Sequence, residues 1–292
     1  MKKFLFGAST AAAAMAATVA LADQPVNWQL GFQEAATPIM EQIRWFEQYT
    51  LWFIVPITLF VSALLVWVII RYRASANPVP SRTSHNTLIE VIWTVGPVVI
   101  LLALAVPSFQ LLTAQYNPDE EPTMTIKATG MQWYWDYEYQ ADTEEEGTVN
   151  FSSIMLREGD RAGLGRENLA EYPRLLAVDN DIVVPVDTTV RLLVTSGDVI
   201  HAFAMPSFGV KVDAVPGRLN ETWFRATREG LFYGQCSELC GKDHAFMPIA
   251  IRVVSQELYD SWRAAAAENL GNANRELMAA LEGNQEVADA GN

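Results

Sequence analysis

Cysteine, histidine and positive charge are all scarce in this chain. Its 292 residues include two cysteines and three histidines, and 20 lysines and arginines stand against 34 aspartates and glutamates, for a net charge of −14. We expect no nucleic-acid partner, because domains that bind nucleic acid are usually basic. The sequence also lacks a P-loop, a G-x-G-x-x-G motif, a Ser–His–Asp spacing and an internal repeat. A C-x-x-C-H sequence is absent too, so no covalently attached haem is expected on this chain.

The N-terminus has the pattern of a secretory signal peptide. Lys2 and Lys3 precede an alanine-rich apolar run, and Ala20-Leu21-Ala22 forms a small-x-small cleavage site before Asp23. A first transmembrane helix is the alternative interpretation, but the run is short and rich in alanine. We therefore predict a signal peptide over residues 1–22, followed by an exported segment over residues 23–44.

Two longer apolar runs are predicted to cross a membrane. The run from Tyr49 to Ile70 contains no charged residue, and a second extends from Leu88 to Leu112. A helix needs about 20 apolar residues to cross a hydrocarbon core of roughly 30 Å. We predict transmembrane helices over residues 45–73 and 88–114, joined by a loop over residues 74–87.

Charge around the two runs sets their orientation. Arg71, Arg73 and Arg82 lie in or beside the connecting loop, whereas Asp119, Glu120 and Glu121 follow the second run. The positive-inside rule places the arginine-bearing loop in the cytoplasm. Both ends of the mature chain then lie outside, in agreement with a signal peptide.

Residues 115–262 are predicted to form an exported all-β domain. Short runs rich in β-branched and aromatic residues alternate with turn residues, which is typical of a sandwich or barrel. The expected strands are Met124–Ala128, Gln132–Tyr139, Ile182–Pro185, Thr188–Thr195, Thr222–Ala226, Leu231–Gly234 and Pro248–Val254. A polar, glycine-rich stretch from Glu158 to Arg174 is expected to be an insertion loop, and a helix is expected to begin at Ser255.

The acidic residues gather in the exported part of the chain. From Gln115 onward, 14 lysines and arginines face 29 aspartates and glutamates, a net charge of −15. This imbalance suits a basic protein partner, although acidic surfaces also serve solubility alone. The tail over residues 263–292 is rich in Ala, Glu and Asn, and we expect it to be disordered or removed.

Both cysteines lie in one stretch of twelve residues that starts at Cys236 and also contains Cys240, His244 and Met247. His201 lies upstream, between two apolar runs. Thiolate, thioether and imidazole ligands together favour copper over hard cations. A Cys236–Cys240 disulfide is an alternative, because exported cysteines tend to pair.

Two other metal sites compete with the disulfide interpretation. Two cysteines and two histidines can close a tetrahedral zinc site, but zinc has no use for Met247. A blue-copper site needs one thiolate, two histidines and a weak axial methionine. The second thiolate in the same loop could instead bridge two copper ions, with one histidine on each.

The residues around this cluster resemble those of cytochrome c oxidase subunit II. The resemblance rests on the copper loop Gln235–Gly241 with His244 and Met247-Pro248, and on Asp198–His201 upstream of it. Further matching stretches are Gly130 with Gln132–Trp135, Glu90–Thr94 and Val212–Arg218. The resemblance covers roughly residues 45–262, and the polar insertion and the tail fall outside it.

The resemblance implies a two-helix transmembrane hairpin plus an all-β, cupredoxin-like Greek-key domain. The signal peptide suggests a bacterial version, which would be a two-pass protein of the inner membrane with its C-terminal domain on the periplasmic side. The expected partners are oxidase subunit I, which carries haem and copper B, subunit III, a cytochrome c donor and membrane lipid.

The family's metal is the binuclear copper A centre. Carried over to this sequence, Cys236 and Cys240 would bridge two copper ions. His201 and Met247 would complete one copper, and His244 and the backbone carbonyl of Glu238 would complete the other. The side chain of Glu238 would point toward a magnesium or manganese site shared with subunit I.

The implied activity is one-electron transfer within an oxidase complex. The chain would accept electrons from cytochrome c and pass them to haem in subunit I, where oxygen is reduced to water and protons are pumped. The chain is thus a subunit of an enzyme, with no catalytic residue of its own. The alternative, from another functional class, is a membrane-anchored copper-binding or copper-delivery cupredoxin without an oxidase role.

Other residues receive roles from the same resemblance. Trp133 is the expected point at which electrons enter the chain, although a tryptophan in an aromatic strand more often packs in a core. Glu90 is the expected mouth of a proton path, although a carboxylate at a helix start also favours the helix dipole. The acids expected to dock the lysine-rich face of cytochrome c are Glu138, Asp142, Glu144, Glu145 and Asp198.

Overall fold

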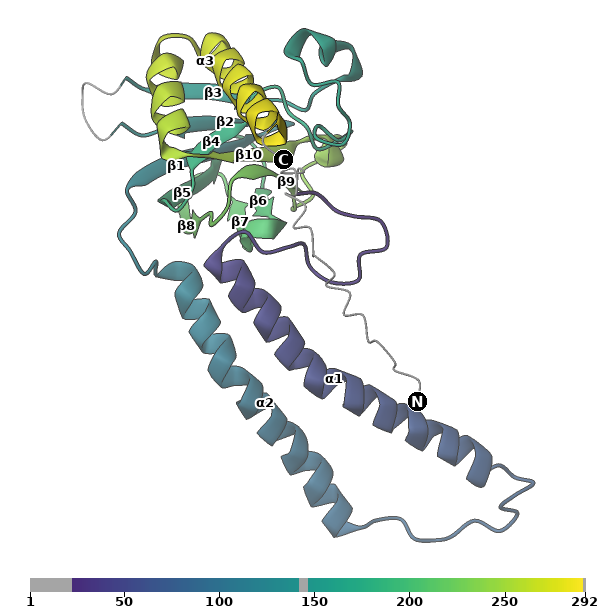
Figure 1. The fold of residues 1–292 in the computed structure, drawn as a ribbon. Helices are drawn as coiled ribbons and strands as arrows, with labels where there is room; N and C mark the ends of the chain where they lie inside the picture. The colour runs from purple at the N-terminus through teal and green to yellow at the C-terminus, as the bar shows by residue number, and fades with distance from the viewer. Residues whose placement is uncertain (1–22, 142–146, 291–292) are drawn as a thin grey trace, which may run out of the picture.

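The computed structural model describes residues 23–141 and 147–290. The predicted signal peptide lies outside the described residues. Two long helices form a hairpin below a β-domain, and a further helical pair covers the top of that domain (Figure 1).

The two membrane helices have clear start signals. Helix α1 spans Pro38–Arg71 and α2 spans Thr87–Tyr116; the side chains of Thr37 and Asn86 cap them by accepting backbone N–H groups of the first turn. Both helices are apolar enough to cross a membrane, with mean hydropathies of 2.8 and 2.4 over their most apolar windows. The Tyr49 hydroxyl donates to the carbonyl of Ala103 at 3.2 Å and joins the pair.

Helix α1 starts seven residues before the predicted span because its first turn belongs to the β-domain. Ile39 and Met40 are buried there, and the Thr37 hydroxyl donates to the carbonyl of Phe208 at 2.8 Å. Asp23 also joins the domain: its N–H donates to the carbonyl of Leu231 at 2.8 Å. The predicted exported segment over residues 23–44 is therefore packed against the domain at both ends.

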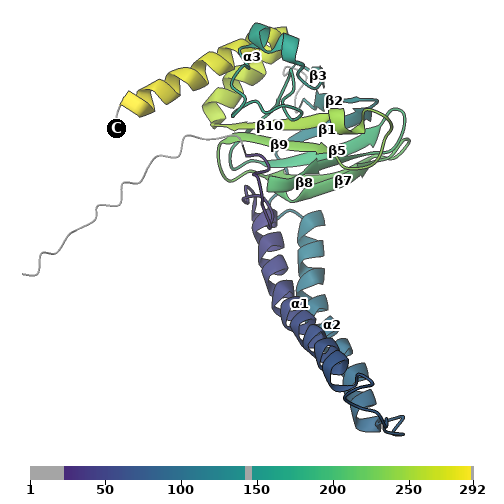
Figure 2. The ribbon, with the colours of Figure 1, turned by 90° about the vertical axis from the view of Figure 1, so that its right-hand side faces the viewer.

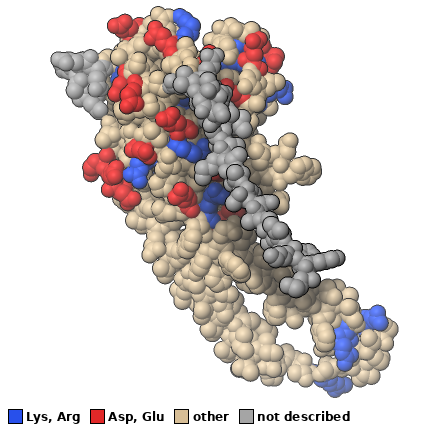
Figure 3. All heavy atoms as spheres, in the orientation of Figure 1, with Lys and Arg blue, Asp and Glu red and all other residues tan. Residues whose placement is uncertain are grey.

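Charge separates along the molecule as the sequence predicted. Figure 3 shows acidic and basic side chains over the β-domain, an uncharged stretch along the helices, and basic side chains at the far loop between them. This pattern suits a two-pass membrane protein whose β-domain stands clear of the bilayer.

The described part of the exported domain contains ten strands in two five-stranded sheets (Figure 2). The first sheet has the order β3-β2-β1-β5-β8, from Val149–Ser153, Tyr134–Tyr139, Met124–Met131, Thr189–Ser196 and Asn220–Arg225. The second has the order β4-β10-β9-β6-β7, from Ile182–Pro185, Pro248–Val254, Gly230–Cys236, His201–Met205 and Val210–Ala214. β1 pairs with β5 in parallel, and β10 pairs with β4 in parallel. This arrangement confirms the all-β, Greek-key-like domain.

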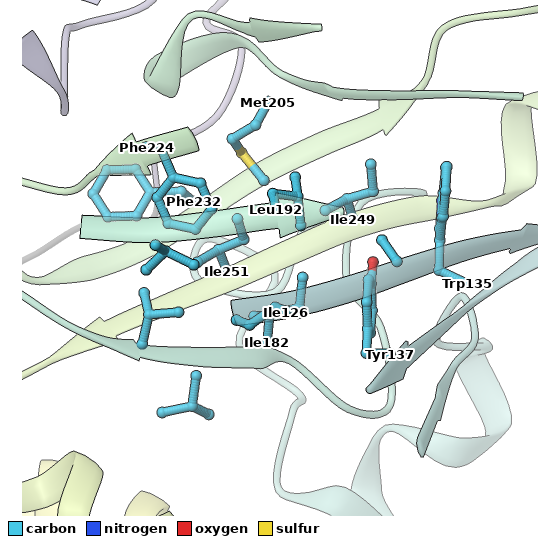
Figure 4. Packing of buried hydrophobic residues seen from close by; sticks show 14 of the residues in the cluster. Ile126, Trp135, Tyr137, Ile182, Leu192, Met205, Phe224, Phe232, Ile249 and Ile251 are labelled. Carbon is cyan, nitrogen blue, oxygen red and sulfur yellow. The ribbon is translucent and has the colours of Figure 1, made fainter. Parts of the chain in front are cut away.

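The core lies between the two sheets. Burial alternates along β1 and β2, because one face of each strand points into the sandwich. Figure 4 shows Ile126, Trp135, Leu192, Phe232 and Ile251 converging from both sheets. β4 and β10 are buried at every position, which fits their apolar sequences, interrupted only by Arg252 of β10.

Three short strands were not among those predicted from sequence, namely β3, β6 and β7. Each is five residues long, and β3 and β7 place polar residues on their outer faces. Such strands form because neighbouring strands supply their hydrogen-bond partners: β2 pairs with β3, and β6 pairs with β9 and β7.

The tail, whose composition predicted a disordered or removed segment, is helical in the described structure. Helix α3 spans Gln256–Ala290 and breaks at Asn269, where φ is −156° and ψ is 103°. The two halves pack together, with Ala266, Ala273 and Leu277 buried and the Trp262 indole N–H donating to Asn274 at 2.9 Å. Small alanine side chains permit this close approach, a property that composition alone does not reveal.

The polar insertion is also more ordered than a loop. It contains two short 3₁₀ turns, η1 at Glu158–Asp160 and η2 at Ala162–Leu164, and it buries Arg166. Arg166 donates to Asp181 at 2.8 Å, and Arg252 of β10 donates to the same carboxylate at 3.0 Å. A buried charge needs such a partner, so this network fixes the insertion onto the second sheet.

Candidate metal centre

Strand pairing brings the upstream histidine to the cysteine loop. His201 is the first residue of β6, Cys236 is the last residue of β9, and Phe203 pairs with Cys236 across the two strands. The loop after Cys236 turns back into β10, and the Cys236 N–H donates to the carbonyl of Met247 at 3.3 Å. His201 and Cys236, which are 35 positions apart in the sequence, thereby share one buried site at the ends of two interior strands.

Six donor atoms converge in this site. The two cysteine Sγ atoms are 3.9 Å apart, and the Nδ1 atom of His201 lies 3.9 Å from Cys236 Sγ. His244 Nδ1 and Met247 Sδ lie 3.6 and 3.5 Å from Cys240 Sγ. The carbonyl oxygen of Glu238 lies 3.4 Å from Cys236 Sγ.

These distances fit a metal better than a disulfide. An S–S bond is about 2.05 Å long, so the thiols at 3.9 Å are free. Metal–thiolate bonds are about 2.3 Å, so one ion can contact both sulfurs. The ligand atoms of His201, Cys236 and Cys240 all lie within 4.8 Å of one another. The soft donors match copper. A zinc site would not need the Met247 thioether as a ligand.

The two thiols differ in acidity. Burial works to raise the pKa of Cys236, but hydrogen bonds with His201 and with the backbone around Glu238 outweigh it and lower the pKa to about 6. Burial and the neighbouring Cys236 charge raise the pKa of Cys240 to about 12. Without a cation between them, the two thiolates cannot both be ionised near neutral pH. A metal that binds both must therefore displace a proton.

Asp198 lies directly behind His201. Its Oδ1 atom is 2.8 Å from His201 Nε2, and its Oδ2 atom accepts the N–H of Gln132 at 2.7 Å. Although burial opposes it, hydrogen bonds from His201, Val199 and Gln132 lower the pKa of this carboxyl. The residue predicted to dock a partner thus directs its carboxylate toward the metal cluster.

Trp133 lies in the turn between β1 and β2, against the copper loop. A Cβ atom on Gly241 would come within 3.0 Å of the Trp133 ring, so the glycine permits this contact. The Gln132 amide donates to the carbonyl of Cys240 at 2.8 Å, and the Nζ atom of Lys242 lies 5.5 Å from the Trp133 ring centroid.

Trp135, two residues after Trp133, is fully buried. Its ring centroid lies 6.0 Å from that of His201 and 5.5 Å from that of Phe203. Gly130 lies beside the same imidazole, and a Cβ atom there would come within 2.8 Å of the His201 ring. The position of the His201 ring therefore depends on the large side chain of Trp135 and on the absence of a side chain at Gly130.

Glu138 and Glu90 lie apart from the cluster. Glu138 pairs with Lys127 on the adjacent strand at 3.5 Å. Glu90 accepts the N–H of Asn86 at 3.3 Å at the start of α2. Asp142, Glu144 and Glu145 lie outside the described residues, and Gln140 marks the opposite end of the β1–β2 hairpin from Trp133.

The sequence analysis gave no role at the cluster to four residues that surround it, namely Gln132, Lys242, Gly130 and Gly241. Only the proximity of Gln132 to Trp133, and of Lys242 and Gly241 to Cys240, gave a signal. Their contacts depend on the fold of two turns that the sequence separates by more than 100 residues.

Comparison with protein families matches most of the described chain. Residues 25–111 match the model described as "Cytochrome C oxidase subunit II, transmembrane domain", and residues 124–254 match "Cytochrome C oxidase subunit II, periplasmic domain". The boundary between the two matches falls between α2 and β1.

Individual relatives are similar over most of their length. A probable cytochrome c oxidase subunit 2 of Rickettsia bellii is 49% identical over 261 residues, which cover 89% of this chain and 92% of the relative. Cytochrome c oxidase subunit 2 of Oenothera berteroana is 49% identical over 249 residues, 84% of this chain and 93% of the relative. A crystal structure of the periplasmic domain of subunit II from Bradyrhizobium japonicum is 54% identical, with a TM-score of 0.44, and covers 52% of this chain and 98% of that one.

Proposed function

The chain belongs to the cytochrome c oxidase subunit II family, and we propose that it accepts electrons from a cytochrome c at a binuclear copper A centre and passes them to haem in subunit I. The observation that carries this proposal is the convergence of two thiols, two imidazoles, a thioether and a backbone carbonyl in one buried site.

Copper bound in this site supplies a carrier that gains and loses one electron at a time. Cys236 and Cys240 would be shared by the two ions, His201 and Met247 would hold one of them, and His244 and the Glu238 carbonyl would hold the other. The chain's role is to keep these donors in place: β6, β9 and β10 fix the backbone on both sides of the loop. A stiff scaffold limits the change in ligand geometry when the charge of the site changes.

Partner contacts follow from the family and from the exposed residues of the site. The Glu238 side chain is exposed beside the cluster, which suits a magnesium or manganese site shared with subunit I. In the proposed assignment the cluster lies on the periplasmic side of a bacterial inner membrane, with subunits I and III as neighbours. Oxygen reduction and proton pumping then belong to the complex, with Glu90 at the mouth of a proton path.

Copper analysis tests the proposed centre directly. The full-length chain, purified in detergent and loaded with copper, is expected to bind two coppers and to give a delocalised mixed-valence paramagnetic signal, because two thiols lie within reach of both ions. Metal analysis and electron paramagnetic resonance measure this. One copper per chain with a blue-copper spectrum would contradict the binuclear centre.

Electron uptake is expected to depend on Trp133 and on surface charge in different ways. Trp133→Gln should slow electron transfer and leave the apparent KM for cytochrome c nearly unchanged, because the ring contacts the copper loop at Gly241 and supplies coupling. Glu138→Gln should raise the apparent KM, with a deficit that shrinks as salt shortens the Debye length, which is about 8 Å at physiological ionic strength.

Lys242 offers a matched control of opposite sign. Its ammonium lies beside Trp133, so Lys242→Gln should speed association with a lysine-rich donor. Stopped-flow measurements at several salt concentrations would distinguish these effects. If Trp133→Gln loses only salt-dependent affinity, the ring is a docking contact and electrons enter elsewhere.

A further inference from the structure

We propose that Asp198 is a positioning residue that holds the ligand His201 and the turn carrying Trp133 as one unit, and so sets the properties of the metal centre. This inference rests on the proposed function. It assigns Asp198 a role different from the cytochrome c docking expected from sequence.

The first step concerns the orientation of His201. Its Nδ1 atom faces Cys236 Sγ at 3.9 Å, and its ring is fully buried. With Nδ1 directed to the metal, the proton of the neutral ring must reside on Nε2, which lies 2.8 Å from Asp198 Oδ1. A carboxylate that accepts this proton fixes the tautomer and the ring orientation, and it makes the imidazole a stronger donor.

The second step concerns the other carboxylate oxygen. Asp198 Oδ2 accepts the backbone N–H of Gln132 at 2.7 Å, and Gln132 directly precedes Trp133. The Gln132 side chain in turn donates to the carbonyl of Cys240 at 2.8 Å. The turn with the tryptophan is thus tied to the centre at two points, through His201 and through Cys240.

Asp198 is itself held in place by its own loop. Its Oδ1 atom accepts the N–H of Val199 at 2.6 Å, and its N–H donates to Ser196 Oγ at 3.2 Å. The Ser196 hydroxyl also contacts the carbonyls of Gly130 and Val199. A carboxylate with both oxygens committed in this way has a fixed position.

The limited exposure of the Asp198 side chain also supports a positioning role. The Asp198 side chain is 26% exposed, whereas that of Glu138 is 46% exposed. Removing a charge that serves docking alone changes encounters with the donor and leaves the isolated centre unaltered. Removing a carboxylate behind a metal ligand changes the centre even when no donor is present.

The experiment compares Asp198→Ala, Asp198→Asn and the charge-matched control Glu138→Gln in the full-length chain in detergent, without cytochrome c. Copper affinity, the paramagnetic spectrum and the reduction potential are measured. We expect Asp198→Ala to lower copper affinity about 10- to 100-fold and to raise the potential, because the anion no longer stabilises the oxidised, more positive centre. Glu138→Gln should change none of these.

Asp198→Asn separates the two halves of the proposal. Its amide oxygen can still accept from His201, so copper affinity should be largely kept. Its NH₂ group would then face the N–H of Gln132, so electron transfer through the Trp133 turn should slow. If both Asp198 variants keep the parent's copper affinity within about twofold and its spectrum and potential unchanged, and in a separate assay with cytochrome c only raise a salt-dependent KM, the residue docks the donor and the proposal is wrong. Failure of the binuclear assignment would show separately, in the parent chain, and copper affinity would still test Asp198.

Discussion

Cys236→Ser and Cys240→Ser are each expected to abolish the mixed-valence copper signal and the oxidase activity of the complex. Both sulfurs lie inside the donor cluster, 3.9 Å apart and buried. A serine hydroxyl is a hard, weakly acidic donor and cannot replace a bridging thiolate. The site would then hold one copper ion, or two copper ions that no longer share both thiolates.

Ser237→Ala is the matched control, because Ser237 is exposed in the same loop. Metal analysis, paramagnetic resonance and oxygen consumption with reduced cytochrome c would measure all three variants. A mixed-valence signal that survived either cysteine substitution would contradict bridging by both thiolates. A copper-delivery protein would instead lose copper binding in these variants without any change in respiration.

Asp181→Asn is expected to cost about 3–5 kcal/mol of folding free energy, because it leaves two buried guanidinium groups without their carboxylate. The Asp181 side chain is 4% exposed and lies between Arg166 and Arg252. Burial works to raise its pKa, but the two arginines outweigh burial and lower it below 3.8. The stability it contributes is therefore present above the unfolded pKa of 3.8 and is lost as the pH falls through the lower folded value.

Glu221→Gln is the control for Asp181→Asn, because it removes the charge of an ion pair that is exposed to water. Glu221 accepts two hydrogen bonds from Arg191, at 2.8 and 2.7 Å, but both side chains are about half exposed. Exposed pairs contribute about 0–1 kcal/mol. Denaturant unfolding of the full-length chain in detergent, followed by tryptophan fluorescence, would compare the two. Equal losses would show that the insertion is not held by its buried network.

The sequence by itself predicted the membrane hairpin, the all-β domain and the copper loop. Long apolar runs and period-2 alternation are local patterns, and each reports directly on burial in lipid or in a sheet. Cys236, Cys240, His244 and Met247 lie within one loop, so their spacing along the chain already suggests their proximity. His201 was considered as a second imidazole upstream of the loop, but only the resemblance assigned it to a particular copper, because nothing near it in the chain indicates a metal.

Only the tertiary structure decided how distant segments meet. The β6–β9 pairing brings His201 to Cys236, and the facing turns bring Asp198 to Gln132. The order of the insertion and the tail had the same origin: Arg166 shares the Asp181 carboxylate with Arg252 of β10, and Leu277 belongs to the buried core cluster. Local sequence patterns record which face of an element is buried, but the identity of the partner across the chain depends on packing and on long-range hydrogen bonds.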